Sequence, residues 1–260
     1  MLGAIIGDIV GSRFEFANYK GKDFELFGPG CDFTDDTIMT VATADAILNG
    51  RRTGGLRYED AYVYWGRKYP HPKGSYGASF AAWLADGVHR PYYSYGNGAG
   101  MRVSPVGFAF NDRISVNLEA FWSAAVSHNH PEGVKGARAI ALSILMIRQG
   151  YTKTALAEYI GKHYNLEATV DEIRETNTFN ETCQVTVPQA ITCFLESTSF
   201  EDAIRNAVSI GGDSDTIGAM TGALAEAYYG IPDDIKKKAK SYLPADLLSI
   251  VNQFNAKYGL

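Results

Sequence analysis

The sequence predicts an all-α protein, folded as a compact orthogonal bundle of many helices. Apolar residues recur at helical spacing along most of the 260 residues. Convincing runs of alternating apolar and polar residues joined by hairpin turns are absent. The nearest candidate strand, Gln184–Val187, is interpreted as the approach to a helix because Pro188 follows it. No low-complexity linker interrupts the chain, so we expect a single domain over residues 1–260.

Helix start and stop signals divide the chain into helices of short and medium length. The expected helices cover residues 2–12, 36–49, 58–68, 77–87, 101–110, 115–127, 132–149, 153–163, 169–175, 186–196, 200–209, 215–229, 233–241 and 245–257. Two stretches between them, residues 16–33 and 88–100, are rich in Gly, Tyr and Phe. Long loops of this kind often carry function, so we expect both to contribute to a site.

The first helix carries Gly3, Gly7 and Gly11 at a strict spacing of four residues. Residues four apart lie on one face of a helix, so these glycines predict a smooth stripe for close contact with another helix. Asp8 interrupts this apolar segment. A buried carboxylate needs partners, so Asp8 is interpreted as bonding the end of a neighbouring helix. Glu15, which follows the helix, is by itself more typical of a surface glutamate.

Two of the later helices begin with clusters of hydroxyl and carboxylate side chains. The first cluster is Thr34–Thr37, and the second is Asp213–Thr216, which follows a pair of glycines. Asp213 and Asp215 stand about 200° apart around an ideal helix, so both reach one point only if the helix begins between them. Taken alone, each cluster is most often a helix cap with an acidic first turn, where free N–H groups and the helix dipole favour ionised carboxylates.

Together, the two acidic helix starts predict a central cleft that binds two metal ions. Four carboxylates that converged there would repel one another strongly in the absence of a cation. Mg²⁺ and Mn²⁺ prefer carboxylate, hydroxyl and water oxygens as ligands. Two such ions about 3.5–4 Å apart, bridged by one aspartate, would relieve the repulsion. This prediction requires that the two helix starts meet in the folded chain.

Two further motifs each have a functional and a structural interpretation. Residues 92–102 contain three glycines within five residues, which allow backbone amides to turn toward a phosphate. The dipeptide Asn97-Gly98 is also common in ordinary turns. His128 and His130 form a pair typical of transition-metal ligation, but no third ligand stands nearby in the sequence. The alternative is a histidine that bonds the last carbonyls of a helix.

In this order, the motifs resemble those of the ADP-ribosylglycohydrolase family, which includes the dinitrogenase-reductase-activating glycohydrolase and the ADP-ribosyl-acceptor hydrolases. The resemblance extends from Gly3 to about Tyr229, and it rests on the order of the motifs because each one alone is weak. The motifs are Gly7-Asp8-Ile9-Val10-Gly11-Ser12-Arg13-Phe14-Glu15, Thr34-Asp35-Asp36-Thr37, Tyr95-Gly96-Asn97-Gly98-Ala99-Gly100-Met101-Arg102, His128-Asn129-His130-Pro131 and Gly211-Gly212-Asp213-Ser214-Asp215-Thr216.

The resemblance implies a set of site residues around two divalent cations, Mg²⁺ or Mn²⁺. Asp215 is the expected bridge between the ions. The resemblance moves Glu15 from the surface to the border of the metal site, facing the scissile ribose, and either Glu15 or Asp35 would be the catalytic proton-transfer group. The expected metal ligands are Thr34, Asp35, Asp36, Asp213, Asp215 and Thr216. The expected substrate-binding residues are Ser94, Tyr95, Gly96, Asn97, Gly98, Met101 and His128.

The resemblance also implies how the substrate would lie. In the family, the loop that matches residues 92–102 holds the diphosphate and the distal ribose, and His128 would lie near ribose or phosphate. The tyrosines of this loop are candidates to stack on adenine, with packing inside the loop as the alternative. Met101 and Arg102 are expected to begin the next helix, where Arg102 is available to add a positive charge.

The implied activity is metal-dependent hydrolysis of the glycosidic bond between ADP-ribose and an acceptor, through an oxocarbenium-like transition state. The cations would grip the ribose hydroxyls, polarise a water and hold the acceptor group. ADP-ribosyl-arginine on a protein is the favoured substrate, because the compact bacterial members act there. Serine-linked ADP-ribose, O-acetyl-ADP-ribose and ADP-ribose on a nucleic-acid base stay open. Specificity is expected in residues 16–33 and near Thr176–Asn180.

Two functions outside this family are also compatible with the motifs. A two-metal hydrolase of nucleotides or phosphoesters would use the same acidic residues and the same phosphate-binding loop. Such an enzyme would release AMP or phosphate, whereas glycosidic cleavage releases intact ADP-ribose. The non-enzymatic alternative is a binding protein on this fold, and the two intact acidic motifs argue against it.

Composition argues against several classes of protein. With 46% hydrophobic and 20% charged residues the chain is typical of a globular protein, and a net charge of −5 argues against nucleic acid as a partner. Cys31, Cys183 and Cys193 are odd in number and lack CxxC spacing, which argues against a disulfide framework and a zinc site. Neither a signal peptide nor a membrane-spanning segment is expected. We therefore expect a cytoplasmic protein without membrane contact. The oligomeric state does not follow from the sequence, and a monomer is the default expectation.

Overall fold

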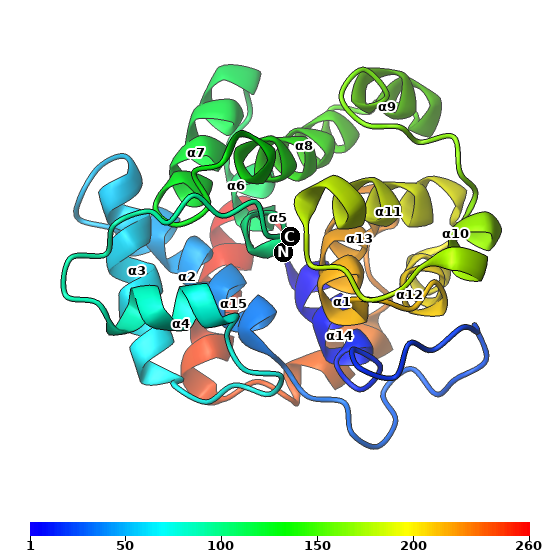
Figure 1. Cartoon of the computed structure of the whole chain (residues 1–260), viewed down its shortest axis with the longest axis horizontal. Helices are drawn as coiled ribbons and strands as arrows, with labels where there is room; N and C mark the ends of the chain where they lie inside the picture. The colour runs from blue at the N-terminus through cyan, green and yellow to red at the C-terminus, as the bar shows by residue number, and fades with distance from the viewer.

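The computed structural model describes residues 1–260 as a bundle of α-helices without a β-sheet, so the all-α prediction is confirmed (Figure 1). Backbone pairing of the strand type is limited to two isolated bridges, Thr34 with Lys73 and Gly96 with Thr182. The helices are α1 (Leu2–Gly11), α2 (Asp35–Asn49), α3 (Gly55–Lys68), α4 (Ala78–Ala85), α5 (Gly98–Met101), α6 (Ser104–Ala109), α7 (Arg113–Ala125), α8 (Pro131–Arg148), α9 (Lys153–Ile160), α10 (Val170–Thr176), α11 (Cys183–Glu196), α12 (Phe200–Ser209), α13 (Ser214–Tyr229), α14 (Asp233–Lys240) and α15 (Ala245–Tyr258).

The centre of the bundle is the contact between α1 and α13, which lie side by side although they come from opposite ends of the sequence (Figure 1). A Cβ atom built on Gly7 would lie 1.9 Å from the carbonyl oxygen of Gly218, and one built on Gly11 would lie 2.3 Å from that of Ser214. Residue numbers rise along α1 as they fall along α13, so the helices are antiparallel. Only glycine allows backbones to approach this closely, so the predicted stripe is the packing face.

The other helices pack around this central pair. Helices α11 and α12 cover further sides of α13, and α8 contacts both α13 and α11. On the other side of the molecule α2 contacts α1, α3 and α15 (Figure 1). The antiparallel arrangement places the end of α1 beside the start of α13. None of the helices combines the length and the apolar character needed to cross a membrane.

The helix predicted over residues 101–110 is wrong as a single element, because it forms two short helices, α5 and α6. Pro105 lies in the first turn of α6 and has no N–H to continue a preceding helix. Helix α11 begins at Cys183, three residues before the predicted start, with Pro188 inside it. The backbone N–H of Cys183 donates to the carbonyl of Tyr95 at 3.0 Å, so a distant loop satisfies the start of α11.

Replacing Gly7 by alanine is expected to destabilise the protein by on the order of 3 kcal/mol, because the new methyl group meets the backbone of α13 and not a flexible side chain. This loss exceeds the gain of about 1 kcal/mol in helix propensity. Urea unfolding followed by circular dichroism measures the change. Gly87→Ala is the control, since nothing lies within 4 Å of its Cβ position. Equal stability of Gly7→Ala and the wild type would contradict the close helix contact.

Candidate active site

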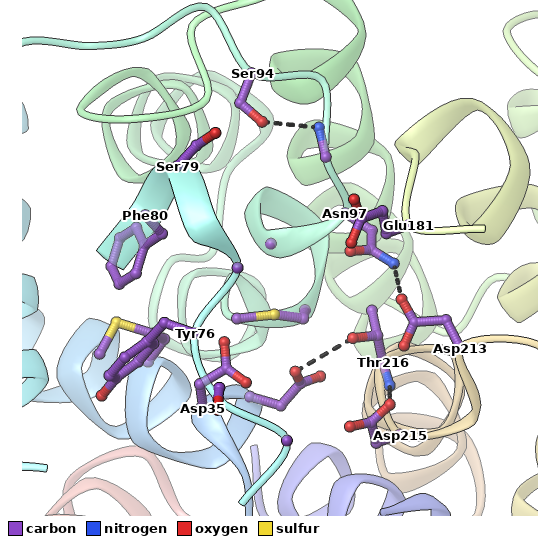
Figure 2. A pocket seen from close by; sticks show the side chains of 18 of the residues that line it. Asp35, Tyr76, Ser79, Phe80, Ser94, Asn97, Glu181, Asp213, Asp215 and Thr216 are labelled. Carbon is purple, nitrogen blue, oxygen red and sulfur yellow. Dashed lines mark hydrogen bonds between the residues drawn. The ribbon is translucent and has the colours of Figure 1, made fainter. Parts of the chain in front are cut away.

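A cavity of about 460 Å³ opens where the end of α1 and the starts of α2 and α13 meet the loop of residues 92–102 (Figure 2). The carboxylates that line this cavity come from segments far apart in the sequence, so the predicted convergence of the two acidic helix starts is confirmed. The carboxylate-bearing residues of its wall are Glu15, Asp35, Asp36, Glu181, Asp213 and Asp215.

Asp8 joins α1 to the start of α2. It is fully buried and accepts hydrogen bonds from the backbone N–H groups of Thr34 and Thr37, each at 3.0 Å, and from both threonine hydroxyls. The interpretation of Asp8 as a residue that bonds a neighbouring helix end is confirmed. Burial raises the pKa of Asp8 to about 6, while these four hydrogen bonds act in the opposite direction. Asp8 therefore positions the first acidic cluster.

Thr34 lies behind the cavity and not in its wall. Its hydroxyl donates to Asp8 at 2.8 Å and accepts from the backbone N–H of Asp36 at 3.2 Å, as an N-cap residue does. One lone pair of the hydroxyl oxygen is left over. Among the six expected metal ligands, Thr34 is the one that does not line the cavity.

The aspartates of the two helix starts lie close together in the cavity (Figure 2). The Thr216 hydroxyl donates to Asp36 Oδ2 at 3.2 Å, which links the start of α13 to the start of α2. The second oxygen of Asp36, Oδ1, is buried and has no hydrogen-bond partner. The Asn97 amide donates to Asp213 Oδ2 at 2.6 Å, so the loop of residues 92–102 orients this carboxylate.

No lysine or arginine forms an ion pair with any aspartate of the cavity. Burial, together with the charges of neighbouring carboxylates, raises the pKa of Asp35, Asp36 and Asp215 well above the usual range. Burial also raises the pKa of Asp213. Asp35 is partly accessible at the cavity surface, whereas the other three are buried. No cationic side chain of the protein therefore stabilises the ionised form of these carboxyl groups.

Glu15 faces this cluster from the segment that follows α1. The side chain is partly exposed and lies beside Gly74, whose Cβ position would be 2.9 Å from Glu15 Oε2. Burial raises the pKa of Glu15 to about 7, with the charges of Asp213 and Asp8 acting in the same direction and Lys73 opposing them. A carboxyl group with such a pKa exchanges a proton readily near neutral pH, which suits a proton-transfer group.

The donor set fits hard divalent cations, although no three His, Cys, Asp or Glu side chains already form a ready-made ligand group. The fit rests on the chemistry of the wall: buried carboxylates without counter-ions, and an Asp36 oxygen without a hydrogen-bond partner. Carboxylate and hydroxyl oxygens are the ligands that Mg²⁺ and Mn²⁺ prefer. The residues that would hold such ions are those of the two helix starts, Asp35, Asp36, Asp213, Asp215 and Thr216, with the remaining lone pair of Thr34.

Most of the expected substrate-binding residues line the cavity, namely Ser94, Gly96, Asn97, Gly98, Met101 and His128. Tyr95 does not. Its side chain is 48% exposed, and its ring packs against His130 with ring centroids 5.3 Å apart. Tyr92 takes the inner position instead, with its ring centroid 5.7 Å from that of His128. For Tyr95, the packing alternative holds in this structure.

Sequence reasoning did not assign several residues that line the cavity. Tyr76, Ser79 and Phe80 come from a segment without a recognised motif, and Glu181 precedes α11 (Figure 2). Phe16 and Phe179 lie in or near the segments where specificity was expected, and their rings meet across the cavity with centroids 6.0 Å apart. The sequence feature that could have indicated Phe16 and Phe179 as cavity residues is that both are aromatic residues in segments expected to be loops.

Fold and site together define an all-α protein in which two acidic helix starts and a glycine-rich loop enclose one cleft. The ADP-ribosylglycohydrolase family profile matches residues 1–259, and the chain belongs to this family. The resemblance inferred from the motifs is confirmed.

Several known proteins are similar over nearly the whole chain. Human ADP-ribosylhydrolase ARH3 is 24% identical, covering 96% of this chain and 90% of its own. The ADP-ribosylarginine hydrolase Tri1 of Pseudomonas putida is 25% identical, covering 93% of this chain and 73% of its own. A solved structure described as an ADP-ribosylglycohydrolase-related protein complex aligns with a TM-score of 0.71 at 24% identity, covering 96% of this chain and 95% of that chain.

The buried imidazole of His128 predicts a pH dependence of stability. Burial and the nearby Arg102 charge hold the pKa of His128 well below its usual range. Below pH 6.5 the unfolded chain binds a proton at His128 that the folded chain does not bind. The free energy of unfolding therefore falls as the pH falls, by about 1.4 kcal/mol per pH unit for one such group. His128→Gln is expected to lose less stability than the wild type between pH 6.5 and 5 in urea unfolding. The exposed His71→Gln is the control, and identical slopes for His128→Gln and the wild type would contradict the neutral buried ring.

Proposed function

We propose that this protein is a metal-dependent hydrolase that cleaves the glycosidic bond between ADP-ribose and an acceptor and releases ADP-ribose. The observation that carries the proposal is the meeting of two acidic helix starts in one cleft, linked by the hydrogen bond from Thr216 to Asp36. Family membership supports the ADP-ribosyl part of the substrate. The names of the two similar hydrolases support hydrolysis as the reaction.

The residues of the cleft have separate roles in metal binding, positioning and proton transfer. Two divalent cations, Mg²⁺ or Mn²⁺, would supply Lewis acidity and activate a water when bound between the helix starts. Asn97 keeps Asp213 oriented, and Asp8 keeps the start of α2 in place. Burial and neighbouring carboxylates raise the pKa of Glu15 to about 7, close to neutral pH, which favours Glu15 over Asp35 as the proton-transfer group.

We favour ADP-ribosyl-arginine as the substrate among the possible conjugates. The similar protein from Pseudomonas putida is named an ADP-ribosylarginine hydrolase. In this chain Phe16 and Phe179 are 75% and 47% exposed and lie at the cavity, and both adjoin a carboxylate-bearing segment, at Glu15 and Glu181. A guanidinium group stacks well on aromatic faces and pairs with carboxylates, whereas a serine oxygen needs neither.

Asp215→Ala is expected to lower the metal-dependent release of ADP-ribose from ADP-ribosyl-arginine by about 100-fold or more, because it removes the expected bridging ligand. The metal-free variant should be at least as stable as the metal-free wild type, because the buried carboxylate is held among like charges. Product release is measured by chromatography with added Mg²⁺ or Mn²⁺ and after chelation, and stability by thermal unfolding.

The control for this variant is Asp234→Ala, which removes an exposed aspartate of α14 and should leave turnover unchanged. Full turnover of Asp215→Ala with two bound metal ions would refute the metal assignment. Release of AMP or phosphate in place of ADP-ribose would indicate a phosphoester hydrolase.

Phe179→Ala is expected to raise KM for ADP-ribosyl-arginine about fivefold, since a cation over an exposed aromatic ring contributes on the order of 1 kcal/mol. The affinity for free ADP-ribose should stay within about twofold, because the product lacks the acceptor. Steady-state kinetics and calorimetry measure the two quantities, with the exposed Ile114→Ala as a control. If Phe179→Ala has an unchanged KM for ADP-ribosyl-arginine, and the wild type hydrolyses serine-linked or O-acetyl-ADP-ribose efficiently, arginine is not the acceptor.

A further inference from the structure

The turn that joins α12 to α13 places the first carboxylate of the second acidic cluster. Two successive glycines, Gly211 and Gly212, have φ values of 65° and 73°, a left-handed conformation that favours glycine. Asp213 follows them directly as the N-cap residue of α13 and lines the cavity (Figure 2). The shape of this turn therefore sets where the Asp213 carboxylate lies and how the first turn of α13 presents Asp215.

Asn177, the residue that ends α10, holds this turn by its carbonyl groups. Its Nδ2 donates to the carbonyl oxygen of Ile210 at 3.2 Å and to that of Gly211 at 3.1 Å. Its Oδ1 accepts from Gln189 Nε2 at 2.8 Å, so the amide is fixed on both sides. A Cβ atom built on Gly212 would lie 2.7 Å from Asn177 Nδ2. The amide therefore packs directly against the turn.

Asn18 holds the same turn from the segment that follows α1. The backbone N–H of Gly212 donates to Asn18 Oδ1 at 3.0 Å. Lys20 joins the two segments, because its Nζ donates to the carbonyl oxygens of Asn177 and Ile210, each at 2.6 Å. Both segments in which specificity is expected thus meet at the backbone that carries the second acidic cluster.

The two asparagine amides have opposite roles toward the turn, and their backbone partners fix which role each one has. Carbonyl oxygens only accept hydrogen bonds, so Asn177 must face the turn with its NH₂ group. A backbone N–H only donates, so Asn18 must face the turn with its oxygen. An ionised aspartate has two acceptor oxygens and no donor. Aspartate can therefore replace Asn18 in this arrangement but cannot replace Asn177.

We propose that Asn18 and Asn177 are positioning residues for the cation site. They hold the turn of Gly211 and Gly212 in the shape that presents the aspartates at the start of α13 to divalent cations. Neither asparagine lines the cavity, so each acts through the backbone of the turn. Removing a partner that orients a metal-binding residue commonly lowers metal affinity by about 10- to 100-fold. The choice of cations as the ligand rests on the proposed function, whereas the hydrogen bonds to the turn are contacts of this chain alone.

The contact with the turn is tested first, in the full chain without metal, by hydrogen exchange of the Gly212 amide followed by NMR. Asn18→Gly removes the acceptor of this N–H, and glycine tolerates the φ of 45° at position 18. Exchange is expected to become faster on the order of tenfold. Asn18→Asp keeps an acceptor oxygen, so its exchange rate should stay within about twofold of the wild-type rate. Equal exchange rates in all three proteins would contradict the contact.

The role of the contact is tested by calorimetry of Mn²⁺ binding to the full chain. Asn177→Asp is expected to weaken binding on the order of tenfold, because the turn loses both of its side-chain donors from this residue. Charge alone predicts the opposite sign, since an added carboxylate attracts cations. Asn18→Gly should also weaken binding, whereas Asn18→Asp should bind at least as tightly as the wild type. Asn117→Asp is the matched control, because it removes an amide donor to a backbone carbonyl on α7, away from the cavity.

The dependence of ADP-ribose release on Mn²⁺ concentration separates a positioning role from general damage to the fold. Asn177→Asp is expected to need on the order of tenfold more Mn²⁺ for half-maximal turnover and to approach wild-type turnover at saturation. Circular dichroism shows whether the variant is folded. If Asn177→Asp does not fold, the comparison of Asn18→Gly with Asn18→Asp is the test.

Mn²⁺ binding by Asn177→Asp that is as tight as in the wild type, or equal losses for Asn18→Gly and Asn18→Asp, would overturn the proposal. A wild type that binds no Mn²⁺ would overturn both this inference and the metal assignment. If the variants behave as expected but the wild type releases ADP-ribose from no conjugate, only the proposed function fails. If the wild type hydrolyses ADP-ribosyl-arginine with Mn²⁺ and Asn177→Asp binds Mn²⁺ equally tightly, only this inference fails.

Discussion

The close antiparallel contact of α1 with α13 is the constraint on which the rest of the structure depends. The backbone of Gly7 touches that of Gly218, and Gly11 touches Ser214, so the end of one helix lies against the beginning of the other. This arrangement places Glu15 opposite Asp213. Asp8 on α1 then binds the start of α2 through four hydrogen bonds and brings the second acidic cluster to the same point. A larger side chain in the glycine stripe would separate the parts of the site.

The cleft is divided electrostatically. The starts of α2 and α13 contribute aspartates that no lysine or arginine neutralises, whereas the loop of residues 92–102 and the segment before α8 contribute Arg102 and His128 without acidic partners. Both walls are unfavourable for folding, because buried charges lose their hydration. Under the proposed function, they would complement a ligand that brought phosphate oxygens to one wall, together with divalent cations at the other. The expected gain on binding explains why a buried arrangement of this kind is tolerable at an active site.

The order of the motifs was enough to predict the family, the all-α class and about half of the residues in the cavity wall. The misplaced elements have physical reasons. Pro105 starts a new helix and divides the expected helix over residues 101–110. The start of α11 lies at Cys183 because the carbonyl of Tyr95 accepts its N–H, a contact between distant segments that no local pattern shows. Tyr76 and Phe80 enter the cavity from a segment without any recognisable motif.

By itself, the sequence determined the positions of the acidic helix starts, the glycine stripe and the glycine-rich loop, because helix caps, helical spacing and turn chemistry are local properties of the chain. Only the tertiary structure decided that Tyr92 and not Tyr95 faces the cavity, that the Thr34 hydroxyl binds Asp8, and that Ser127 joins Arg102 to His128. Side-chain partners of this kind depend on which helix faces are brought together. That outcome follows from packing the whole core, and no single segment encodes it.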